Sequence, residues 1–320
     1  MSKKKTSLFK KIAVPGAVIG SAWLAAGSAF IEMNLSRNGI KKVASSGGVV
    51  SDEDCRCFYE SDEALAGQKF HKERTYDNIS MMNRSGTRLH AMYYQAETPS
   101  HVYAFSCHGY TGEPYQNACY AKRFFDMGFN VILPHLRGHG ESEHKYCTMG
   151  WLDRLDIVDW VNAIVEKDPE AKIILHGVSM GAATVMMATG EALPDNVICC
   201  IEDCGFTSLC DQFSVQIREK TQIPANVILN IAEPAARLIL GFSLKDASAM
   251  EQVKHSKTPT LFIHGDKDST VPFWMNYPLF NNASCEKERL VVPGATHAAA
   301  GYAFPEIYWN GITEFIGKYL

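Results

Sequence analysis

The sequence carries no large excess of charge of either sign. Its 31 Lys and Arg residues stand against 35 Asp and Glu residues, which gives a formal net charge of -4 over 320 residues. A chain without surplus positive charge has little with which to neutralise phosphates, so we expect no nucleic-acid partner. Paired Cys-x-x-Cys motifs with zinc spacing are also missing, so we expect no metal site.

Internal repeats and low-complexity tracts are absent too, which excludes repeat architectures and fibrous proteins. The composition, 46% hydrophobic and 21% charged, is typical of a globular protein with one large or two modest cores. Of the ten cysteines, Cys199 and Cys200 lie in one apolar run and Cys107 ends another. Cysteine behaves there as a small hydrophobe, so we expect mostly free thiols and at most one or two disulfides.

The N-terminus combines positive charge with a long apolar stretch. Five lysines precede residues 12–31, which contain no charged residue. This pattern predicts a basic cytoplasmic tail over residues 1–11 and a transmembrane signal anchor over 12–33, with the remainder outside the cytoplasm. Two alternatives stay open: a signal peptide cleaved near Gly27-Ser28-Ala29, which would give a secreted protein, and a buried helix.

Residues 34–75 are polar and weakly periodic, and we interpret them as a linker or N-terminal extension with one helix near 60–72. From residue 76 to 320, short apolar runs alternate with helical patterns, which predicts an α/β domain with a mostly parallel sheet and helices on both faces. The expected strands are 79–82, 89–94, 102–106, 131–133, 173–175, 197–201, 260–263 and 290–292. The expected helices are 115–127, 151–167, 181–193 and 302–319.

The segment from about 207 to 257 interrupts this alternation. It contains helical stretches such as 227–240 but no strand. An apolar insertion of that size after a strand end predicts a small helical cap over the site. Ligands of such sheets bind beyond the carboxyl ends of the strands, so candidate residues should collect there.

Three strand ends carry residues suited to catalysis. Ser179 stands between glycines in the run Gly177-Val178-Ser179-Met180-Gly181, with an apolar strand before it and a helical pattern after it. A second strand ends in Asp266 and Asp268, and a third is followed by His297. The order Ser, Asp, His along the chain is the order of an α/β-hydrolase triad.

Residues 76–320 resemble serine hydrolases of the α/β-hydrolase superfamily, including monoacylglycerol-lipase-like, esterase-like and prolyl-aminopeptidase-like members. The matching segments are Cys107-His108-Gly109-Tyr110-Thr111-Gly112, Leu136-Arg137-Gly138-His139-Gly140-Glu141-Ser142, the serine motif, His264-Gly265-Asp266-Lys267-Asp268 with Val271-Pro272, and Gly294-Ala295-Thr296-His297. The first seventy or so residues have no counterpart in this resemblance.

A serine nucleophile needs a base, and the base needs a carboxylate at its other nitrogen, which gives Ser179 and His297 their roles. The resemblance implies that the carboxylate is Asp268 and that Asp266 is a turn residue. The backbone N–H of Met180 follows the nucleophile and is one expected oxyanion donor. The resemblance implies the Tyr110 N–H as the second donor. We expect His108, His176 and His264 to be structural.

These residues predict hydrolysis of a small or medium acyl ester through an acyl-serine intermediate, without a cofactor. A peptidase of the prolyl-aminopeptidase or prolyl-oligopeptidase type, acting on short peptides, is the alternative within the same chemistry, and acyl transfer to an alcohol is another. A membrane-tethered binding protein that keeps the fold without the reaction is the alternative from a different class.

Overall fold

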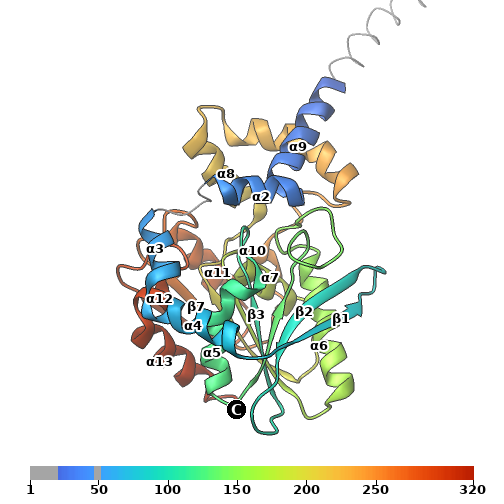
Figure 1. Cartoon of the computed structure of the whole chain (residues 1–320). Coiled ribbons are helices and arrows are strands. Elements are labelled where there is room, and N and C mark those ends of the chain that lie inside the picture. The colour runs from blue at the N-terminus through green and yellow to red at the C-terminus, as the bar shows by residue number, and fades with distance from the viewer. Residues whose placement is uncertain (1–20, 47–51) are drawn as a thin grey trace, which may run out of the picture.

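An eight-stranded β-sheet forms the centre of the molecule (Figure 1). The computed structural model describes residues 21–46 and 52–320. The strands are β1 (Asp77–Met82), β2 (Arg88–Tyr94), β3 (Val102–Cys107), β4 (Asn130–Pro134), β5 (Lys172–Val178), β6 (Val197–Asp203), β7 (Thr260–Gly265) and β8 (Lys287–Val292). Their order is β1-β2-β4-β3-β5-β6-β7-β8. The β1–β2 and β2–β4 pairs are antiparallel and all others parallel, which confirms the predicted mostly parallel sheet.

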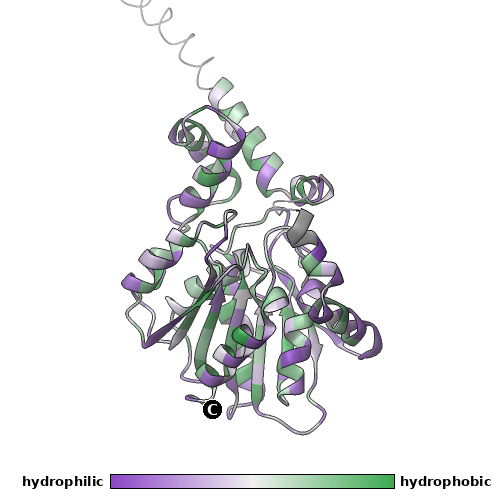
Figure 2. Ribbon diagram, turned by 90° about the vertical axis from the view of Figure 1, so that its left-hand side faces the viewer, coloured by the Kyte–Doolittle hydropathy of each residue, from purple (hydrophilic) through white to green (hydrophobic). Residues whose placement is uncertain are grey.

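Helices cover both faces of the sheet. On one face, α5 (Ala118–Asp126) and α13 (Pro305–Ile316) pack in one hydrophobic cluster. On the other, α6 (Asp153–Lys167) and α7 (Met180–Thr189) pack in a second cluster. Because both faces are covered, β5 is buried along all but its first residue, and hydrophobic residues concentrate on the central strands (Figure 2). Short helices complete the domain: η1 (Pro114–Asn117), α10 (Ala249–Gln252), η2 (Phe273–Met275), α11 (Asn276–Asn282) and α12 (Ala300–Ala303).

The predicted insertion between β6 and β7 contains α8 (Leu209–Lys220) and α9 (Ala225–Ile239), which we call the cap. Both helices lie outside the sheet, above the carboxyl ends of its strands (Figure 1). The Ser208 hydroxyl begins α8 by accepting a hydrogen bond from the Asp211 N–H at 3.0 Å. The chain therefore leaves the sheet for the cap at a defined helix start.

Residues 21–35 form a helix that packs on the cap. A Cβ on Gly27 would lie only 2.4 Å from the backbone oxygen of Ile231 on α9, so the two helices approach closely. The ring centroids of Phe30 and Phe213 of α8 are 5.3 Å apart. Within residues 21–46 and 52–320, no helix is both long and apolar enough to cross a membrane. Residues 1–11, and residues 12–20 of the predicted 12–33 span, lie outside the described residues.

Residues 34–75, predicted to hold one helix, contain three: α2 (Arg37–Ser45), α3 (Asp52–Glu60) and α4 (Asp62–Glu73). Helix α4 packs tightly on α5 at Gly67. A Cβ at this position would lie only 2.5 Å from the Cys119 backbone nitrogen, so the close approach depends on the absence of a side chain. The buried residues of α4, Ala64 and Gly67, are small and leave little hydrophobic periodicity in the sequence. Residues 21–46 and 52–73 are called the N-terminal extension below.

Eight cysteines in the described part of the chain carry free thiols, and six of them are buried in the two clusters beside the sheet. The eight are Cys107, Cys119, Cys147, Cys199, Cys200, Cys204, Cys210 and Cys285. Burial raises the pKa of the Cys210 thiol to about 11, although this residue is only half-buried. The Cys210 thiol is therefore protonated at neutral pH, and the six buried cysteines contribute as apolar side chains.

Candidate active site

Ser179 lies in a strained turn between β5 and α7. Its φ of 57° is in the left-handed region, which a side chain with a Cβ rarely adopts. The flanking glycines make the turn sterically feasible: a Cβ on Gly177 would lie 2.3 Å from the Gly181 oxygen, and one on Gly181 would lie 2.0 Å from the Cys107 oxygen. The Ser179 N–H donates to the Asp203 carbonyl at 2.8 Å, which ties the turn to β6.

The structure brings His297 and Asp268 to this serine from the turns after β8 and β7. His297 Nε2 lies 2.9 Å from Ser179 Oγ, and His297 Nδ1 lies 2.8 Å from Asp268 Oδ2. His297 and Asp268 are each only 6% exposed. Three side chains from distant parts of the sequence thus form one hydrogen-bonded line, with the imidazole between the hydroxyl and the carboxylate.

The two carboxylates after β7 have different surroundings. Burial alone would raise the pKa of Asp268, but the charge of His297 and hydrogen bonds from His264 and His297 lower it to about 2. Its second oxygen accepts the Val271 N–H at 2.9 Å. Asp266 is exposed and instead accepts the Gly294 N–H at 2.7 Å. Asp268 is therefore the carboxylate at the histidine, and Asp266 stabilises a turn.

The two expected oxyanion donors flank Ser179. Met180 follows the serine and begins α7, so its N–H is among the unpaired donors at a helix N-terminus. Tyr110 lies in the loop after β3, where a Cβ on Gly109 would lie 3.6 Å from the Cβ of Ser179. The Tyr110 hydroxyl donates to the carbonyl oxygen of Asn34 in the N-terminal extension, and its carbonyl contacts His139 Nε2. The side chain and carbonyl of Tyr110 are thus both anchored.

The other predicted histidines have structural surroundings. His108 is fully buried, Leu136 N–H donates to its Nε2 at 3.3 Å, and burial lowers the pKa of its ring well below the ordinary value. His176 Nε2 lies 3.0 Å from the Tyr308 hydroxyl, and burial lowers its pKa to about 3. His264 Nε2 donates to a backbone carbonyl at 2.9 Å and lies 3.4 Å from the carboxylate of the line.

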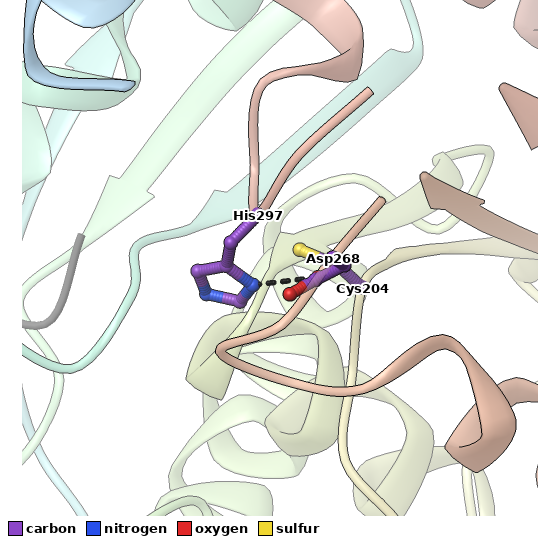
Figure 3. A group of neighbouring side chains, drawn as sticks. All are labelled: Cys204, Asp268 and His297. Carbon is purple, nitrogen blue, oxygen red and sulfur yellow. Dashed lines mark hydrogen bonds and ion pairs between the residues drawn. The ribbon is translucent and has the colours of Figure 1, made fainter. Parts of the chain in front are cut away.

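Cys204 is a neighbour of this line that the sequence analysis missed. The Cys204 sulfur, a carboxylate oxygen of Asp268 and a ring nitrogen of His297 all lie within 4.8 Å of one another (Figure 3). Burial raises the pKa of the Cys204 thiol well above its ordinary value, so it offers a thiol rather than a metal-binding thiolate. Its position directly after β6, at the edge that carries the other site residues, was the available signal.

A cavity of about 790 Å³ opens onto Ser179 and His297. Its walls come from the loop after β3, from the cap and from the N-terminal extension. Residues of the extension that line it are Ala44, Phe58, Tyr59, Ala64, Gly67, Gln68 and His71. The extension therefore borders the candidate site, although its sequence gave no indication of this.

Comparisons with known proteins identify the fold that carries this site. A family model described as alpha/beta hydrolase fold matches residues 106–222, which include the loop after β3, the serine turn and the start of the cap. The uncharacterized protein YqkD of Bacillus subtilis (strain 168) is 26% identical over 221 residues, covering 69% of this chain and 72% of YqkD. The thermostable monoacylglycerol lipase of Bacillus sp. (strain H-257) is 32% identical over 93 residues, or 28% of this chain and 34% of the lipase.

Among solved structures, the esterase Pf2001 of Pyrococcus furiosus superimposes with a TM-score of 0.63 at 21% identity, covering 77% of this chain and 92% of the esterase. The observed topology, the family model matched over residues 106–222 and these relatives lead to one assignment: the chain has the α/β-hydrolase fold.

Proposed function

We propose that the protein is a serine hydrolase that cleaves an acyl ester through an acyl-serine intermediate. The observation that carries the proposal is the hydrogen-bonded line of Ser179, His297 and Asp268, with contacts of 2.9 and 2.8 Å. In this proposal Ser179 is the nucleophile, His297 the general base and Asp268 the group that orients the imidazole and stabilises its charged form.

The geometry supports a reaction in two halves. His297 Nε2 takes the proton of Ser179 as Oγ bonds to the ester carbonyl carbon, and the carbonyl electron pair moves onto oxygen. The N–H groups of Tyr110 and Met180 stabilise that oxyanion. When the intermediate collapses, the C–O bond to the alcohol breaks and His297 gives the alcohol its proton. Water then attacks the acyl-serine by the same route and releases the acid.

The choice of an ester rests on further support. The names of the similar proteins above include an esterase and a monoacylglycerol lipase, both of which act on esters. The cavity beside Ser179 is lined by aromatic and small apolar side chains, which suit an acyl group. The low pKa of Asp268, about 2, keeps its carboxylate charged beside the histidine at any ordinary assay pH.

Labelling with a fluorophosphonate probe tests the nucleophile. We expect the wild-type protein to be labelled and Ser179→Ala to remain unlabelled with an unchanged melting temperature. Ser208→Ala is the control, because Ser208 caps α8 away from the histidine, and its labelling should persist. A folded wild-type protein that resists labelling would support the non-catalytic binding protein instead.

A substrate panel tests the ester. p-Nitrophenyl esters of increasing acyl length should be hydrolysed, and aminoacyl-anilides should react far more slowly. Activity confined to the anilides would replace the esterase by a peptidase. Product analysis with added glycerol separates acyl transfer from hydrolysis, because transfer yields a new ester.

We further propose that the N-terminal segment attaches the chain to a membrane, with the hydrolase domain outside the cytoplasm. The uncharged stretch 12–31 after five lysines supports this, as do exposed apolar side chains at Trp23 (55%), Leu24 (38%) and Leu238 (73%). The contact of Gly27 with α9 competes with insertion of the same helix.

Extraction and topology experiments test this attachment. The full chain should remain in the membrane fraction after carbonate extraction. The double variant Val18→Lys, Ile19→Lys should instead appear in the soluble fraction, because two charges in the apolar stretch oppose insertion. Alkaline phosphatase fused after Leu320 should be active. Full-length protein in the soluble fraction would contradict attachment, and a shortened chain in the medium would support the secreted alternative.

A further inference from the structure

Tyr110, whose N–H is one oxyanion donor of the proposed mechanism, lies in a loop with little rigidity of its own. Gly109 precedes it and Gly112 follows two residues later, and residues 109–113 are half-buried rather than packed in the core. Glycine gives the backbone conformational freedom. An oxyanion hole stabilises charge only if its donors are already oriented before the reaction. The direction of the Tyr110 N–H must therefore be fixed by contacts from other side chains.

The peptide plane before Tyr110 is held by His108. The Leu136 N–H donates to His108 Nε2 at 3.3 Å, so the ring hydrogen is on Nδ1, which donates to the Gly109 carbonyl at 2.8 Å. Burial lowers the pKa of this ring well below its ordinary value, which keeps the ring neutral. The Gly109 carbonyl and the Tyr110 N–H belong to one trans peptide plane and point in opposite directions. The N–H therefore points away from His108.

The peptide plane after Tyr110 is held by His139. This residue is 3% exposed, and its Nε2 contacts the Tyr110 carbonyl oxygen. A carbonyl oxygen only accepts hydrogen bonds, so the contact is a hydrogen bond when Nε2 carries the ring hydrogen. The two planes meet at the Cα of Tyr110. A bond at one plane alone leaves the loop free to pivot about it, whereas bonds at both planes fix the N–H between them.

The segment that carries His139 is well supported. Nδ1 of His139 lies 2.9 Å from the carbonyl oxygen of Arg137, whose guanidinium group pairs with the buried Asp156 at 2.5 and 2.7 Å. A Cβ on Gly138 would lie 2.5 Å from the Cys147 backbone nitrogen, so the segment also packs closely on another part of the chain. A side chain can orient a catalytic group only from such a fixed position.

We propose that His139 is a positioning residue for the oxyanion hole: its Nε2 donates to the Tyr110 carbonyl and thereby fixes the Tyr110 N–H that stabilises the oxyanion. In this role the ring touches neither the substrate nor the reacting atoms and acts through Tyr110. Its loss should raise the energy of the tetrahedral intermediate more than that of the bound substrate. The inference rests on the proposed ester hydrolysis and adds a residue to that mechanism.

Two amide variants separate the two contacts of the ring. In His139→Gln the amide nitrogen takes the place of Nε2, and in His139→Asn it takes the place of Nδ1, because each lies the same number of bonds from the backbone as the ring nitrogen it replaces. The Gln variant can still donate to Tyr110, whereas the Asn variant can donate only to Arg137. With p-nitrophenyl butanoate, kcat should stay within about threefold of the wild type in His139→Gln and fall about tenfold in His139→Asn, with KM unchanged in both.

A trifluoromethyl ketone inhibitor gives a second readout. Ser179 Oγ bonds to its carbonyl carbon, the serine proton passes to His297, and the carbonyl electron pair becomes an oxyanion in the oxyanion hole. The inhibition constant should rise about tenfold in His139→Asn and remain near the wild-type value in His139→Gln. A ring that only stabilises the fold would change the melting temperature without changing kcat and this constant together.

His144→Asn is the matched control. His144 lies in the same loop, its Nδ1 lies 3.0 Å from the Tyr146 carbonyl oxygen, and its Nε2 lies 3.1 Å from the guanidinium of Arg137. Its amide keeps the first of these contacts, as the amide of His139→Asn keeps the contact to Arg137. The control should retain the wild-type kcat and inhibition constant.

Each outcome has a distinct meaning. Wild-type kcat in His139→Asn, equal losses in the Gln and Asn variants, or an equal loss in the control overturns the inference while the proposed function stands. If only one His139 variant folds, its kcat decides by the same expectation, and failure of both to fold assigns the ring to stability and overturns the inference as well. A wild-type protein that hydrolyses no ester removes the proposed function itself.

Discussion

Two regions of the molecule border the same cavity and are held in place by different forces. At the carboxyl edge of the sheet, Ser179 and Asp268 follow strands that are paired on both sides, His297 follows the edge strand β8, and all three side chains have hydrogen-bonded partners. The N-terminal extension reaches the cavity from outside the sheet. It is held by helix packing at Gly27 and Gly67 and by hydrogen bonds to loops.

The sheet edge and the N-terminal extension therefore have different tasks at the cavity. The sheet edge holds the reacting atoms within hydrogen-bond distance of one another. The buried surroundings of Ser179 offset the cost of its strained φ. The extension contributes walls to the cavity and an anchor for the loop after β3, the bond from the Tyr110 hydroxyl to Asn34. Changes at the sheet edge should therefore affect the rate of the chemical step, whereas changes in the extension should affect selectivity more than rate.

The largest effect on the reaction rate is expected from Asp268, the carboxylate that is hydrogen-bonded to His297. Asp268→Asn should lower kcat by on the order of 10⁴-fold, because the amide cannot stabilise the charged imidazole and favours the wrong tautomer. Asp266→Asn, two residues away, should stay within about threefold of the wild type, since Asp266 accepts only a turn N–H. Steady-state kinetics on one p-nitrophenyl ester measure both. Equal losses in the two variants would contradict the assignment of Asp268.

The next largest effect concerns stability against pH. Burial raises the pKa of Asp203, at the end of β6, from its ordinary 3.8 to about 6. Between about pH 4 and 6 the folded protein binds more protons at this residue than the unfolded chain, so the contribution of Asp203 to stability falls as the pH rises through this window. Asp203 contributes about 3 kcal/mol to the free energy of unfolding for a pKa shift of this size. This contribution is present below pH 4 and is lost above pH 6.

Asp268 has the opposite sign. Its folded pKa of about 2 lies below 3.8, so its contribution is present above pH 4 and is lost as the pH falls toward 2. The buried His176, with a pKa of about 3, contributes in the opposite direction over the same window, so the test compares two proteins. In urea unfolding from pH 3 to 8, the free energy of unfolding of Asp203→Asn relative to that of the wild type should rise between pH 4 and 6. A difference between the two proteins that does not change with pH would mean that Asp203 does not titrate in this window.

A smaller effect should come from the anchor between the two regions. Tyr110→Phe removes the hydroxyl that donates to Asn34 but keeps the backbone N–H that we propose for the oxyanion. We expect kcat to fall about tenfold with little change in KM, because a less well fixed N–H stabilises the transition state less. Tyr93→Phe is the control, since its hydroxyl contacts Asn130 away from the site at 3.0 Å. Wild-type kcat in Tyr110→Phe would show that the anchor has no role in catalysis.

Much of the sheet edge could be predicted from the sequence because its signals are local. A buried strand followed by Gly177, Ser179 and Gly181 predicts a tight turn with an exposed hydroxyl, and the glycines have the steric role expected of them. The eight apolar runs also predicted the strands of the observed sheet. Choosing Asp268 over Asp266 needed the family resemblance, since both carboxylates follow the same strand.

The extension was harder to predict because its contacts are made by small residues and by the backbone. Gly27, Ala64 and Gly67 give close helix packing without a hydrophobic stripe, and the acceptor for Tyr110 is a carbonyl group, which every residue has. Cys204 follows a strand end but belongs to no motif.

The smallest expected effect tests the extension by itself. Ala64 lines the cavity from α4 and is 3% exposed, so Ala64→Leu places a larger side chain at a wall of the cavity whose apolar lining suits an acyl group. The kcat/KM for a dodecanoate ester should fall roughly fivefold while that for a butanoate ester is unchanged. Ala66→Leu makes the same change on the same helix at a half-buried position outside the cavity lining, and should leave the ratio of the two esters unaltered. An equal loss for both esters in Ala64→Leu would place α4 among the elements that support the reacting groups, and the division of tasks between the two regions would no longer hold.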